Sequence, residues 1–588
     1  MPSITGGALI AAMLAAEGVE VVVGIIDGTY FGLYAAFRDH GIRLVSPRHE
    51  SSAAHMAGAY ARLTGKLGVC MASNGPGVAN ILPGVAVENG EGNRVLLLTS
   101  SRRTGITYPD RGGTFQYFHQ VGVTRPMTKW SGTVPAFERI PEMMRRAFRM
   151  SHKGRPGVVH VDVPENILNG TFKVPNLEVS PPSTYRRVAP IAPDPALVRR
   201  SADLLLSARL PVIHAGNGVI AARAFDELRA VAEFLHAPVT TSWAGRSAQA
   251  ETHPLAVPMI HVELNNRVRN EADTVLALGT RLGETDWWGK PPYWRKSEEQ
   301  QLIQVDVDED ILGVNKPLTL GVLADARVYL QALLAELEER GDPGDVEFRK
   351  ARMGEYRKVA AKARGELDRS LKKSADGVHP SLVATTCREV FDDDAILVID
   401  GGNTAVWANF YHEVREPNTV LTTPKFGMLG AGVSQALGAR VAYPDRQVYC
   451  IIGDGAMGFH PQEVETAVRN ELPVVYIVLC DRQWGMVKMT QQFQMKPLKT
   501  LIKKSLGPEE TINTDLGEIR FDLLAESMGA RGERVSSPEE LEPALRRCMD
   551  DGRCGVVHVD VDPVAHMWAP ALKHFKDMHQ EPAGEPWM

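Results

Sequence analysis

Three blocks of the chain alternate short β-branched runs with helical patterns, and this alternation restricts the possible folds more than any other feature. The first block carries runs such as "VEVVVGI", "LGVCMAS" and "RVLLLTS", the second "LPVIHAGNG" and "DTVLALGTRL", and the third "AILVIDGGN" and "LPVVYIVLCD". Short apolar runs separated by helices are typical of parallel strands that are covered on both faces. We therefore expect an α/β protein of three doubly wound domains with parallel sheets.

Two segments of different composition separate the blocks. "LEVSPPSTYRRVAPIAPDPA" is rich in proline and has no period, so it is predicted to be a linker. "FRKARMGEYRKVAAKARGELDRSLKK" is highly charged, and its pattern predicts a solvated connecting helix. The first and third blocks end in the similar strings "GVVHVDVP" and "GVVHVDVDP", which suggests a duplication. The predicted domains are 1–180, 190–340 and 365–562, followed by a tail, 563–588.

Composition narrows the class of protein. With 44% hydrophobic residues, 23% charged residues and a formal charge of -6, the chain has no excess of positive charge, so we expect no nucleic-acid partner. The apolar start, "ALIAAMLAAEGVEVVVGII", lacks a basic segment and includes Glu17 and Glu20, which favours a helix and a strand over a signal peptide. No apolar run is long enough to span a membrane. Six cysteines without a CxxC pair indicate reduced residues in a cytoplasmic protein.

Two aspartates follow the ends of two neighbouring strands in the third block. Asp454 lies in "IIGDGAMGFH", and Asp481 follows the apolar run "VVYIVLC" twenty-seven positions later, with one helix predicted between them after Gly458. Because the carboxyl ends of parallel strands meet at one edge of a sheet, the two carboxylates are expected to be neighbours. With glycines beside them, they suit Mg²⁺ shared with a phosphate. Two unrelated turn residues remain the alternative.

A glutamate in the first block lies at the start of a predicted helix. Glu50 follows "RLVSP" and opens the small-residue helix "SSAAHMAGAYARLTG", and a "GPG" turn comes after the next strand. On these residues alone, Glu50 fits a helix cap that the helix dipole favours.

The two motifs together are similar to those of the thiamine-diphosphate enzymes. The GDG sequence, followed at this spacing by "CDRQWGM", resembles their cofactor motif, although Cys480 and Asp481 stand where that family has two asparagines. The segment around Glu50 resembles their "HExxAxxxAxGxARxTG … GPG" block, and the resemblance covers essentially the whole chain. It implies a pyrimidine-binding domain, a middle domain and a diphosphate-binding domain, with each site shared between two subunits of a homodimer or homotetramer.

The resemblance also implies roles for single residues. Asp454, Asp481 and the backbone carbonyl of Gln483 would bind Mg²⁺, and Glu50 would exchange a proton with the cofactor's aminopyrimidine ring. The remaining expected cofactor contacts are Gly77, Asn80, Asn403, Thr404, Gly427, Leu429, Gly453, Gly455, Ala456, Met457, Trp484 and Met486. Gly427 would accept the 4′-amino group with its carbonyl, and Leu429 would bend the cofactor. Trp484 would shape the substrate pocket or simply pack.

Three residues are expected to face the substrate. Two of them differ from the residues usual in the family, and the third is the neighbour of one of these two. They are Asp27 in "GIIDGTYF", and Gln116 and Tyr117 in "TFQYFHQ". Tyr117 stands where a glutamate is usual, and Asp27 stands where small or apolar residues are usual. Asp27 would be either a proton shuttle or a structural turn residue.

Local strings indicate a branch within the family. "GFHPQEVETAVRNELPV", "GGNTAVW" and "GTRLGETDWWGKPPYW" resemble 2-hydroxyacyl-CoA lyases and oxalyl-CoA decarboxylases, and the "RFDDR" of flavin-containing acetolactate synthases is absent. This branch implies ADP in the middle domain, with FAD as the alternative. Asp306, at the end of "LIQVD", would bind a ribose hydroxyl. Arg155 in "GRPG" would bind a phosphate, unless it is an exposed turn residue.

The predicted activity is cleavage of a short, linear or branched 2-hydroxyacyl-CoA to formyl-CoA and an aldehyde or ketone, reversible as a ligation. The alternatives are an acetolactate-synthase-like carboligase that acts on pyruvate or another 2-oxo acid with FAD, an oxalyl-CoA decarboxylase, and a subunit that only regulates a partner. The tail is expected to be a lid that excludes water, in which Trp568, Lys573 and Lys576 help to hold CoA, or else a disordered end.

Overall fold

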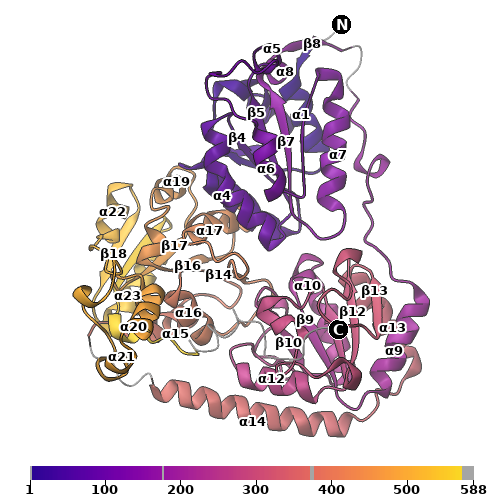
Figure 1. The fold of residues 1–588 in the computed structure, drawn as a ribbon, viewed down its shortest axis with the longest axis vertical. Coiled ribbons are helices and arrows are strands. Elements are labelled where there is room, and N and C mark those ends of the chain that lie inside the picture. The colour runs from indigo at the N-terminus through magenta and orange to yellow at the C-terminus, as the bar shows by residue number, and fades with distance from the viewer. Residues whose placement is uncertain (1–2, 175–177, 371–375, 572–588) are drawn as a thin grey trace.

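Three α/β domains follow one another along the chain. The computed structural model describes residues 3–174, 178–370 and 376–571. Figure 1 shows the N-terminal domain in indigo and purple, the middle domain in magenta, and the C-terminal domain in orange and yellow. The long helix α14 (Val346–Ser370) runs along the lower side from the middle domain to the C-terminal domain. The predicted fold class is therefore confirmed.

The N-terminal sheet has six parallel strands in the order β3-β2-β4-β5-β7-β6. Helices α1 (Gly6–Ala16) and α7 (Ile140–His152) contribute to the core on one face, and α3 (Glu50–Thr64) and α4 (Pro76–Glu91) to the core on the other. The strands are β2 (Val21–Gly24), β3 (Arg43–Val45), β4 (Gly68–Ala72), β5 (Val95–Ser101), β6 (Trp130–Thr133) and β7 (Val158–Pro164). A separate antiparallel pair joins β1 (Ser3–Thr5) to β8 (Thr171–Lys173).

The C-terminal sheet repeats this arrangement strand for strand, in the order β15-β14-β16-β17-β19-β18. Its strands are β14 (Ile396–Asp400), β15 (Val420–Leu421), β16 (Val448–Gly453), β17 (Val475–Cys480), β18 (Arg531–Val535) and β19 (Gly555–Asp560). The similar "GVVHVDV" strings form β7 and β19, which occupy the same place in the two sheets. The similarity noted in the sequence therefore extends to the topology of both domains.

The two faces of the C-terminal sheet are covered by different sets of helices. Alternate residues of β16 face opposite sides, as expected for a strand: Cys450 and Ile452 belong to one core, and Tyr449 and Ile451 to the other. The first face is covered by α17 (Ala431–Ala442), α19 (Glu463–Arg469) and α22 (Phe521–Ser527). The second is covered by α15 (Pro380–Val390), α16 (Asn403–Tyr411) and α23 (Pro538–Asp550).

The middle domain is a five-stranded parallel sheet in the order β10-β9-β11-β12-β13. The strands are β9 (Pro211–Ala215), β10 (Val239–Thr241), β11 (Thr274–Leu278), β12 (Gln301–Asp306) and β13 (Leu320–Leu323). Helices α9 (Pro195–Ser207), α11 (Phe225–Leu235), α12 (Val262–Glu271) and α13 (Ala326–Arg340) pack against it. The order reverses between β9 and β11, and in doubly wound sheets such a point is where ligands bind.

The N-terminal and C-terminal domains share one hydrophobic core through α3 and α17. The two helices approach so closely that a Cβ atom on Gly438 would lie 2.3 Å from the carbonyl oxygen of Met56. Only glycine avoids this clash. Close packing at this point connects the helix that starts at Glu50 to the domain that carries Asp454.

Helix α14 departs from its prediction as a fully solvated connection. The helix itself is confirmed, but Met353 and Tyr356 are buried against the middle domain. Arg349 is also buried, because its guanidinium donates to the carbonyls of Leu235 and Ala208 at 2.7 Å each. A charged side chain can be buried when its donors meet carbonyl oxygens, and a charge count does not reveal this.

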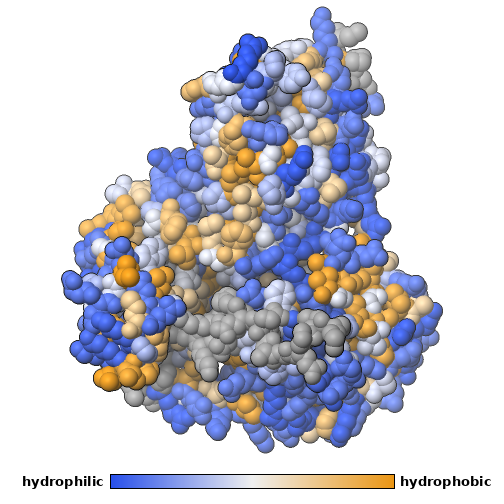
Figure 2. Space-filling model, in the orientation of Figure 1, coloured by the Kyte–Doolittle hydropathy of each residue, from blue (hydrophilic) through white to orange (hydrophobic). Residues whose placement is uncertain are grey.

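Two further expectations concern the surface and the cysteines. Within the described residues, no helix combines the length and the apolar composition needed to cross a bilayer. All six cysteines are buried, and none is paired with another. Figure 2 shows apolar side chains gathered on parts of the N-terminal and C-terminal domains, among hydrophilic ones.

Candidate functional site

Asp454 and Asp481 lie at the same edge of the C-terminal sheet, as predicted. Strands β16 and β17 are parallel neighbours, and Gly453 pairs with Leu479 at their ends. Burial and, next, the negative charge of Asp481 together raise the pKa of Asp454 to about 7. Asp481 is buried and Asp454 is half-buried, and two such carboxylates that repel each other are stabilised by a divalent cation between them.

The backbone at Asp454 differs from the prediction. Its Oδ1 accepts the N–H of Gly455 and its Oδ2 that of Arg482, both at 2.7 Å. Asp454 itself begins the short helix α18 (Asp454–Met457), and α19 begins only at Glu463. The helix expected after Gly458 is therefore present as α19, although it begins only at Glu463, and α18 is an additional short helix before Gly458. Pro461, which lacks an N–H, lies between the two helices and disfavours a continuous one.

Asp481 is buried and held by two partners. Its Oδ2 accepts the Nε2–H of Gln483 at 3.1 Å and contacts Nδ1 of His566 at 2.6 Å. Its Oδ1 has one longer contact, 3.3 Å to the backbone N–H of Gln483. Sequence reasoning did not find His566, because it lies 85 residues further along the chain and in no recognised motif.

Asn403 and Thr404 begin α16 beside this edge, immediately after Gly401 and Gly402. Asn403 is buried, yet neither its side-chain oxygen nor its nitrogen has a hydrogen-bond partner. A Cβ on Gly485 would lie 2.5 Å from Asn403 Nδ2 and 3.6 Å from Asp481 Oδ2, so the three residues are adjacent. An orphaned amide next to two carboxylates at a helix N-terminus fits a bound metal and diphosphate.

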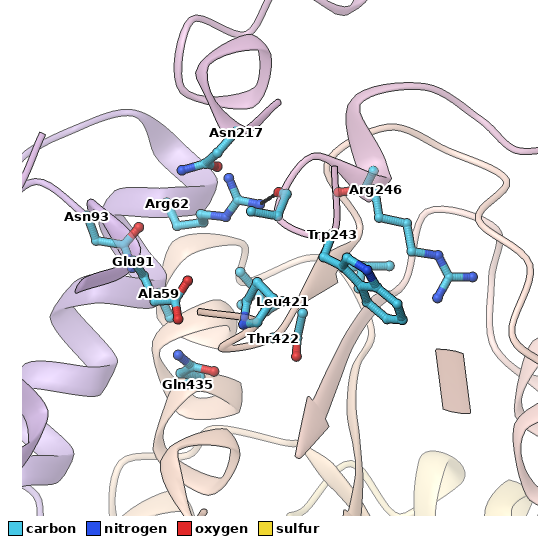
Figure 3. Close-up of a pocket in the computed structure, with 14 residues that line it drawn as sticks. Ala59, Arg62, Glu91, Asn93, Asn217, Trp243, Arg246, Leu421, Thr422 and Gln435 are labelled. Carbon is cyan, nitrogen blue, oxygen red and sulfur yellow. Dashed lines mark hydrogen bonds between the residues drawn. The ribbon is translucent and has the colours of Figure 1, made fainter. Parts of the chain in front are cut away.

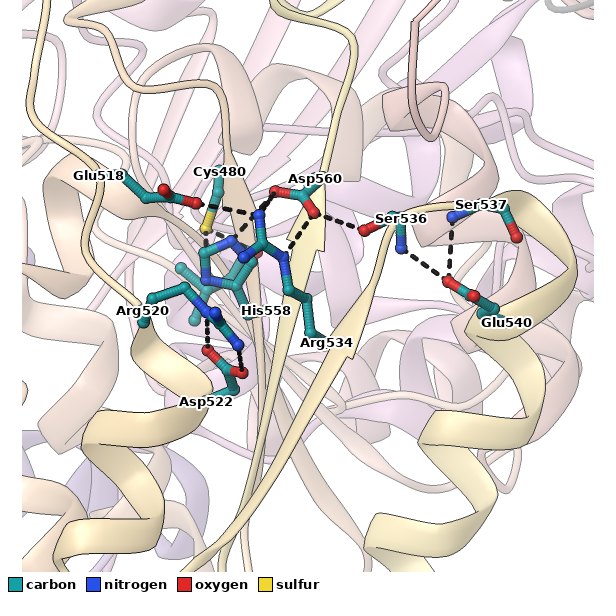
Figure 4. Close-up of polar contacts among 11 residues, drawn as sticks. Cys480, Glu518, Arg520, Asp522, Arg534, Ser536, Ser537, Glu540, His558 and Asp560 are labelled. Atoms are coloured by element: carbon teal, nitrogen blue, oxygen red, sulfur yellow. Dashed lines mark hydrogen bonds and ion pairs between the residues drawn. The ribbon is translucent and has the colours of Figure 1, made fainter.

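Cys480 faces away from Asp481, toward another cluster. Its Sγ lies 3.5 Å from Nδ1 of His558, whose Nε2 contacts Asp560 at 3.2 Å (Figure 4). Glu518 completes a group whose ligand atoms lie close enough for a cation. However, the Arg534 guanidinium donates to both carboxylates, at 2.8 and 3.1 Å to Asp560 and 2.9 Å to Glu518. The cluster is thus an ion-pair network that already contains its own cation.

Glu50 begins α3, as predicted, and its Oε2 accepts the Nδ2–H of Asn80 at 3.0 Å. The preceding residue, His49, caps the helix, and its ring lies 5.3 Å from that of His460. Nε2 of His460 also lies 3.4 Å from the hydroxyl of Ser51. The loop after Asp454 therefore reaches the start of the helix that carries Glu50.

Asp27 lies in a turn beside Tyr30. Its Oδ1 accepts the N–H of Thr29 at 2.8 Å and the hydroxyl of Thr29 at 2.6 Å, so it acts as a cap of that turn. Burial raises the pKa of Tyr30, and the nearby charges of Asp27 and Glu50 raise it further. Asp27 therefore acts as a structural turn residue, and its role as a proton shuttle stays a prediction.

Gln116 and Tyr117 lie in the loop before α6 (Gln120–Thr124), where Gln116 contacts the turn that leads into α4. The carbonyl oxygen of Gln116 accepts the Nδ2–H of Asn74 at 2.9 Å. The backbone of Gln116 is in the left-handed region, with a φ of 51°. A Cβ on Gly75 would lie 2.5 Å from the same carbonyl oxygen. The turn continues into α4, which also carries Gly77 and Asn80. Gln116 is exposed and Tyr117 is half-buried.

The expected cofactor loops surround the metal edge. Gly427 is exposed with a φ of 64°, and Leu429 packs against the core shared by the two domains. Trp484 covers Gly455 so closely that a Cβ there would lie 2.6 Å from the indole ring. Met486 lies against Gly402. Two other expected contacts, Ala456 and Met457, are buried.

A cavity of about 1370 Å³ lies beside the middle domain and is lined by residues of all three domains. Asp306, at the end of β12, is one of them, and burial raises its pKa to about 6. Arg155 also lines the cavity, but its guanidinium donates to the carbonyl of Gly90 at 2.8 Å. It is therefore half-buried and anchored, and not a freely exposed turn residue.

A second, smaller pocket lies where the three domains meet. Figure 3 shows Arg62, Glu91, Trp243 and Gln435 converging on it from different domains. Burial raises the pKa of Glu91 to about 7. Its Oε1 accepts the N–H groups of Lys425 and Phe426 at 3.0 and 2.9 Å, directly before Gly427.

Only part of the predicted tail is described. Helix α24 (Pro563–Met567) follows β19, and Nε1 of Trp568 donates to the carbonyl of Lys504 at 2.7 Å. Lys573 and Lys576 lie outside the described residues, as does most of the segment expected to be a lid.

Three family models match the chain in the expected order. They are the N-terminal domain (residues 4–123), the central domain (198–333) and the C-terminal domain (400–560) of thiamine pyrophosphate enzymes. The chain belongs to the thiamine pyrophosphate enzyme family. Thiamine pyrophosphate and thiamine diphosphate are the same cofactor, and the first and third models are described as binding it.

Full-length relatives in this family are distant. The probable acetolactate synthase large subunit of Methanocaldococcus jannaschii is 28% identical, and the alignment covers 95% of this chain and 92% of the relative. The acetolactate synthase isozyme 3 large subunit of Escherichia coli K12 is 28% identical over 97% of each chain. The sulfoacetaldehyde acetyltransferase of Castellaniella defragrans is 29% identical over 91% of this chain and 89% of its own length. These relatives support a thiamine-diphosphate-dependent enzyme.

Proposed function

We propose that this enzyme is a carboligase that cleaves a small 2-oxo acid and transfers the resulting acyl unit to a second molecule. The observation that carries the proposal is the adjacency of Asp454, Asp481 and the orphaned Asn403 at one sheet edge, with Glu50 at the start of α3. Likeness over nearly the full length to acetolactate synthase subunits supports a carboligase, and likeness to a sulfoacetaldehyde acetyltransferase supports transfer of an acyl unit.

The residues of this chain would divide the work as follows. Asp454, Asp481 and the carbonyl of Gln483 would hold Mg²⁺, and the start of α16 would bind the diphosphate. Glu50 would hold and exchange a proton at N1′ of the pyrimidine, with Asn80 fixing the carboxylate. When bound, thiamine diphosphate would supply a nucleophilic carbon that adds to a carbonyl group, and its positively charged ring would accept the electrons of the broken bond. Asp27, Gln116 and Tyr117 would face the substrate.

A second candidate is cleavage of a short 2-hydroxyacyl-CoA to formyl-CoA and an aldehyde or ketone, with oxalyl-CoA decarboxylation as its variant. The strings "GFHPQEVET", "GGNTAVW" and "GTRLGETDWWGKPPYW" favour it. In this candidate the tail would close over the CoA ester. Trp568, anchored to Lys504, would be the fixed start of that lid.

The large cavity suits a nucleotide that contains ADP, either ADP itself or FAD. Asp306 ends a strand at the carboxyl edge of the sheet, where it would accept a ribose hydroxyl. Arg155 would contribute charge near the phosphates. Nucleotide released from the denatured protein and identified by mass distinguishes the two, and a visible flavin absorption band would favour FAD. A purified protein with neither would contradict this assignment.

A second copy of this chain would complete each site. Large aromatic side chains are exposed near the expected substrate and cofactor positions: Phe31 is 58% exposed, Phe115 71%, Phe426 46% and Phe459 51%. Exposed apolar side chains gathered near a site are typical of an interface. Light scattering after size-exclusion chromatography should show a dimer or tetramer, and a monomer at micromolar concentration would contradict the proposal. The buried, unpaired cysteines support a reducing, cytoplasmic location.

The function is tested by supplying Mg²⁺ and thiamine diphosphate together with a panel of substrates. The panel contains pyruvate and other 2-oxo acids, sulfoacetaldehyde, 2-hydroxyacyl-CoAs of different branching, and oxalyl-CoA, and products are identified by mass spectrometry. Ligation products from a 2-oxo acid support the first candidate. Formyl-CoA formed from a 2-hydroxyacyl-CoA, without turnover of 2-oxo acids, would replace it with the second. Catalysis only in the presence of another protein would contradict both and favour a regulatory subunit.

A further inference from the structure

We propose that His566 is a positioning residue for the metal ligand Asp481, so that α24 is a structural part of the metal site. The proposal deepens the function proposed above and rests on its assignment of Asp481 to Mg²⁺. His566 lies after the last strand and beyond residue 560, where the match to the C-terminal family model ends.

Both ring nitrogens of His566 are engaged. Nδ1 lies 2.6 Å from Asp481 Oδ2, and Nε2 lies 3.0 Å from the hydroxyl of Thr404. In the neutral ring one arrangement satisfies all three side chains: Nδ1–H donates to the carboxylate, and Nε2 accepts from the hydroxyl. The ring thereby connects the strand end that carries Asp481 to the helix start expected to bind the diphosphate.

The position of the ring is set by the backbone around it. The carbonyl of His566 accepts the indole N–H of Trp407 at 2.9 Å. Nε2 of Gln483 donates to the carbonyl of Pro563 at 2.7 Å as well as to Asp481. Asp562 caps α24 by accepting the N–H groups of Val564 and Ala565. His566 is only 4% exposed, so the imidazole is held among these contacts and not in solvent.

This arrangement determines which oxygen of Asp481 is available to a cation. Oδ2 receives two donors, from His566 and Gln483, whereas Oδ1 has one contact of 3.3 Å. The histidine therefore holds the carboxylate in the orientation that presents Oδ1. Residues that orient a ligating carboxylate in this way contribute about 10- to 100-fold to metal affinity.

Two substitutions separate the two hydrogen bonds of the ring. The amide of asparagine takes the place of Nδ1, so His566→Asn retains a donor for Asp481 and loses the contact with Thr404. The amide of glutamine reaches the place of Nε2, so His566→Gln retains the contact with Thr404 and loses the donor for Asp481. If the inference holds, His566→Gln weakens Mg²⁺ binding by about 10- to 100-fold, and His566→Asn changes it only a few-fold.

The measurement is a Mg²⁺ titration of the cofactor-free full-length protein at saturating thiamine diphosphate, followed by tryptophan fluorescence. Trp484, which packs on Gly455, is the expected reporter. The matched control is His412→Gln, because His412 is buried in the same domain but contacts Tyr449 at 2.7 Å and not the site. It should leave Mg²⁺ affinity unchanged.

Each outcome decides one question. Equal Mg²⁺ affinity in the wild type, His566→Gln and His566→Asn would overturn the inference. Equal weakening in both His566 variants would overturn it too, because it would reflect loss of packing and not loss of the Nδ1 donor. A wild-type protein that shows no Mg²⁺-dependent cofactor binding would overturn the metal assignment itself, which distinguishes failure of the proposed function from failure of this inference.

Discussion

The carboxylate of Glu463, in the C-terminal domain, accepts the backbone N–H of Arg48, which lies two residues before Glu50. The nitrogen of Arg48 is 3.2 Å from Oε1 and 3.0 Å from Oε2. The carboxylate is buried, which raises its pKa, and it also accepts the hydroxyl of Thr466. This contact joins the segment after Asp454 to the residues that lead into α3, the helix that begins at Glu50. It holds the N-terminal and C-terminal domains of one chain together.

Replacing Glu463 with alanine should therefore lower both stability and turnover. The part-buried N–H of Arg48 and the buried hydroxyl of Thr466 lose their acceptor, which costs about 1–3 kcal/mol of unfolding free energy. Chemical denaturation and steady-state kinetics measure the two effects. Glu465→Ala, on the same helix but at a more exposed ion pair with Arg469, is the control and should change stability by less than about 1 kcal/mol. Equal effects of the two substitutions would argue against the role given to Glu463.

Glu50→Gln should nearly abolish turnover while leaving the fold and cofactor binding intact. The amide can still accept the hydrogen bond of Asn80, but it cannot exchange a proton, and loss of a general acid–base group lowers kcat by about 10²- to 10⁴-fold. Product formation is compared with Mg²⁺-dependent binding of thiamine diphosphate in the same preparation. Glu142→Gln, an exposed position of the same domain, should retain full activity. Normal turnover by Glu50→Gln would refute its assignment.

Glu91 should make stability depend on pH. In the folded protein burial raises its pKa to about 7 from its usual 4.5, so between these values the folded state binds more protons than the unfolded chain. The unfolding free energy of the wild type should therefore fall, relative to Glu91→Gln, as pH rises from about 4.5 to 7, by up to about 3 kcal/mol. Urea denaturation of both proteins across this range gives the difference. Glu138→Gln, at an exposed position, should follow the wild type at every pH.

Gly438→Ala should weaken the packing of the N-terminal domain on the C-terminal domain. The added Cβ would lie 2.3 Å from the carbonyl oxygen of Met56, so α3 and α17 must move apart. Overpacking of this kind costs about 1–3 kcal/mol. Gly354→Ala in α14 is the matched control, because a Cβ there meets nothing within 4 Å and alanine favours the helix by up to about 1 kcal/mol. Thermal denaturation should move the two variants in opposite directions.

The amino-acid sequence by itself determined the three parallel-sheet domains and the pairing of Asp454 with Asp481. Both follow from local rules: apolar runs that alternate with helical patterns, and strand ends that meet at one edge. Cys480 and Asp481 could also be assigned to opposite sides, because successive strand residues point in opposite directions.

Only the tertiary structure decided which groups hold those residues in place. His566 meets Asp481 across 85 positions, and Glu463 meets Arg48 across 415, so no periodicity or spacing could have shown either contact. The first turns of helix α14 pack against the middle domain, because the guanidinium of Arg349 donates to backbone carbonyls of that domain. Such contacts depend on how finished helices and sheets pack against one another, which is set by the shape of the whole chain and not by any one segment.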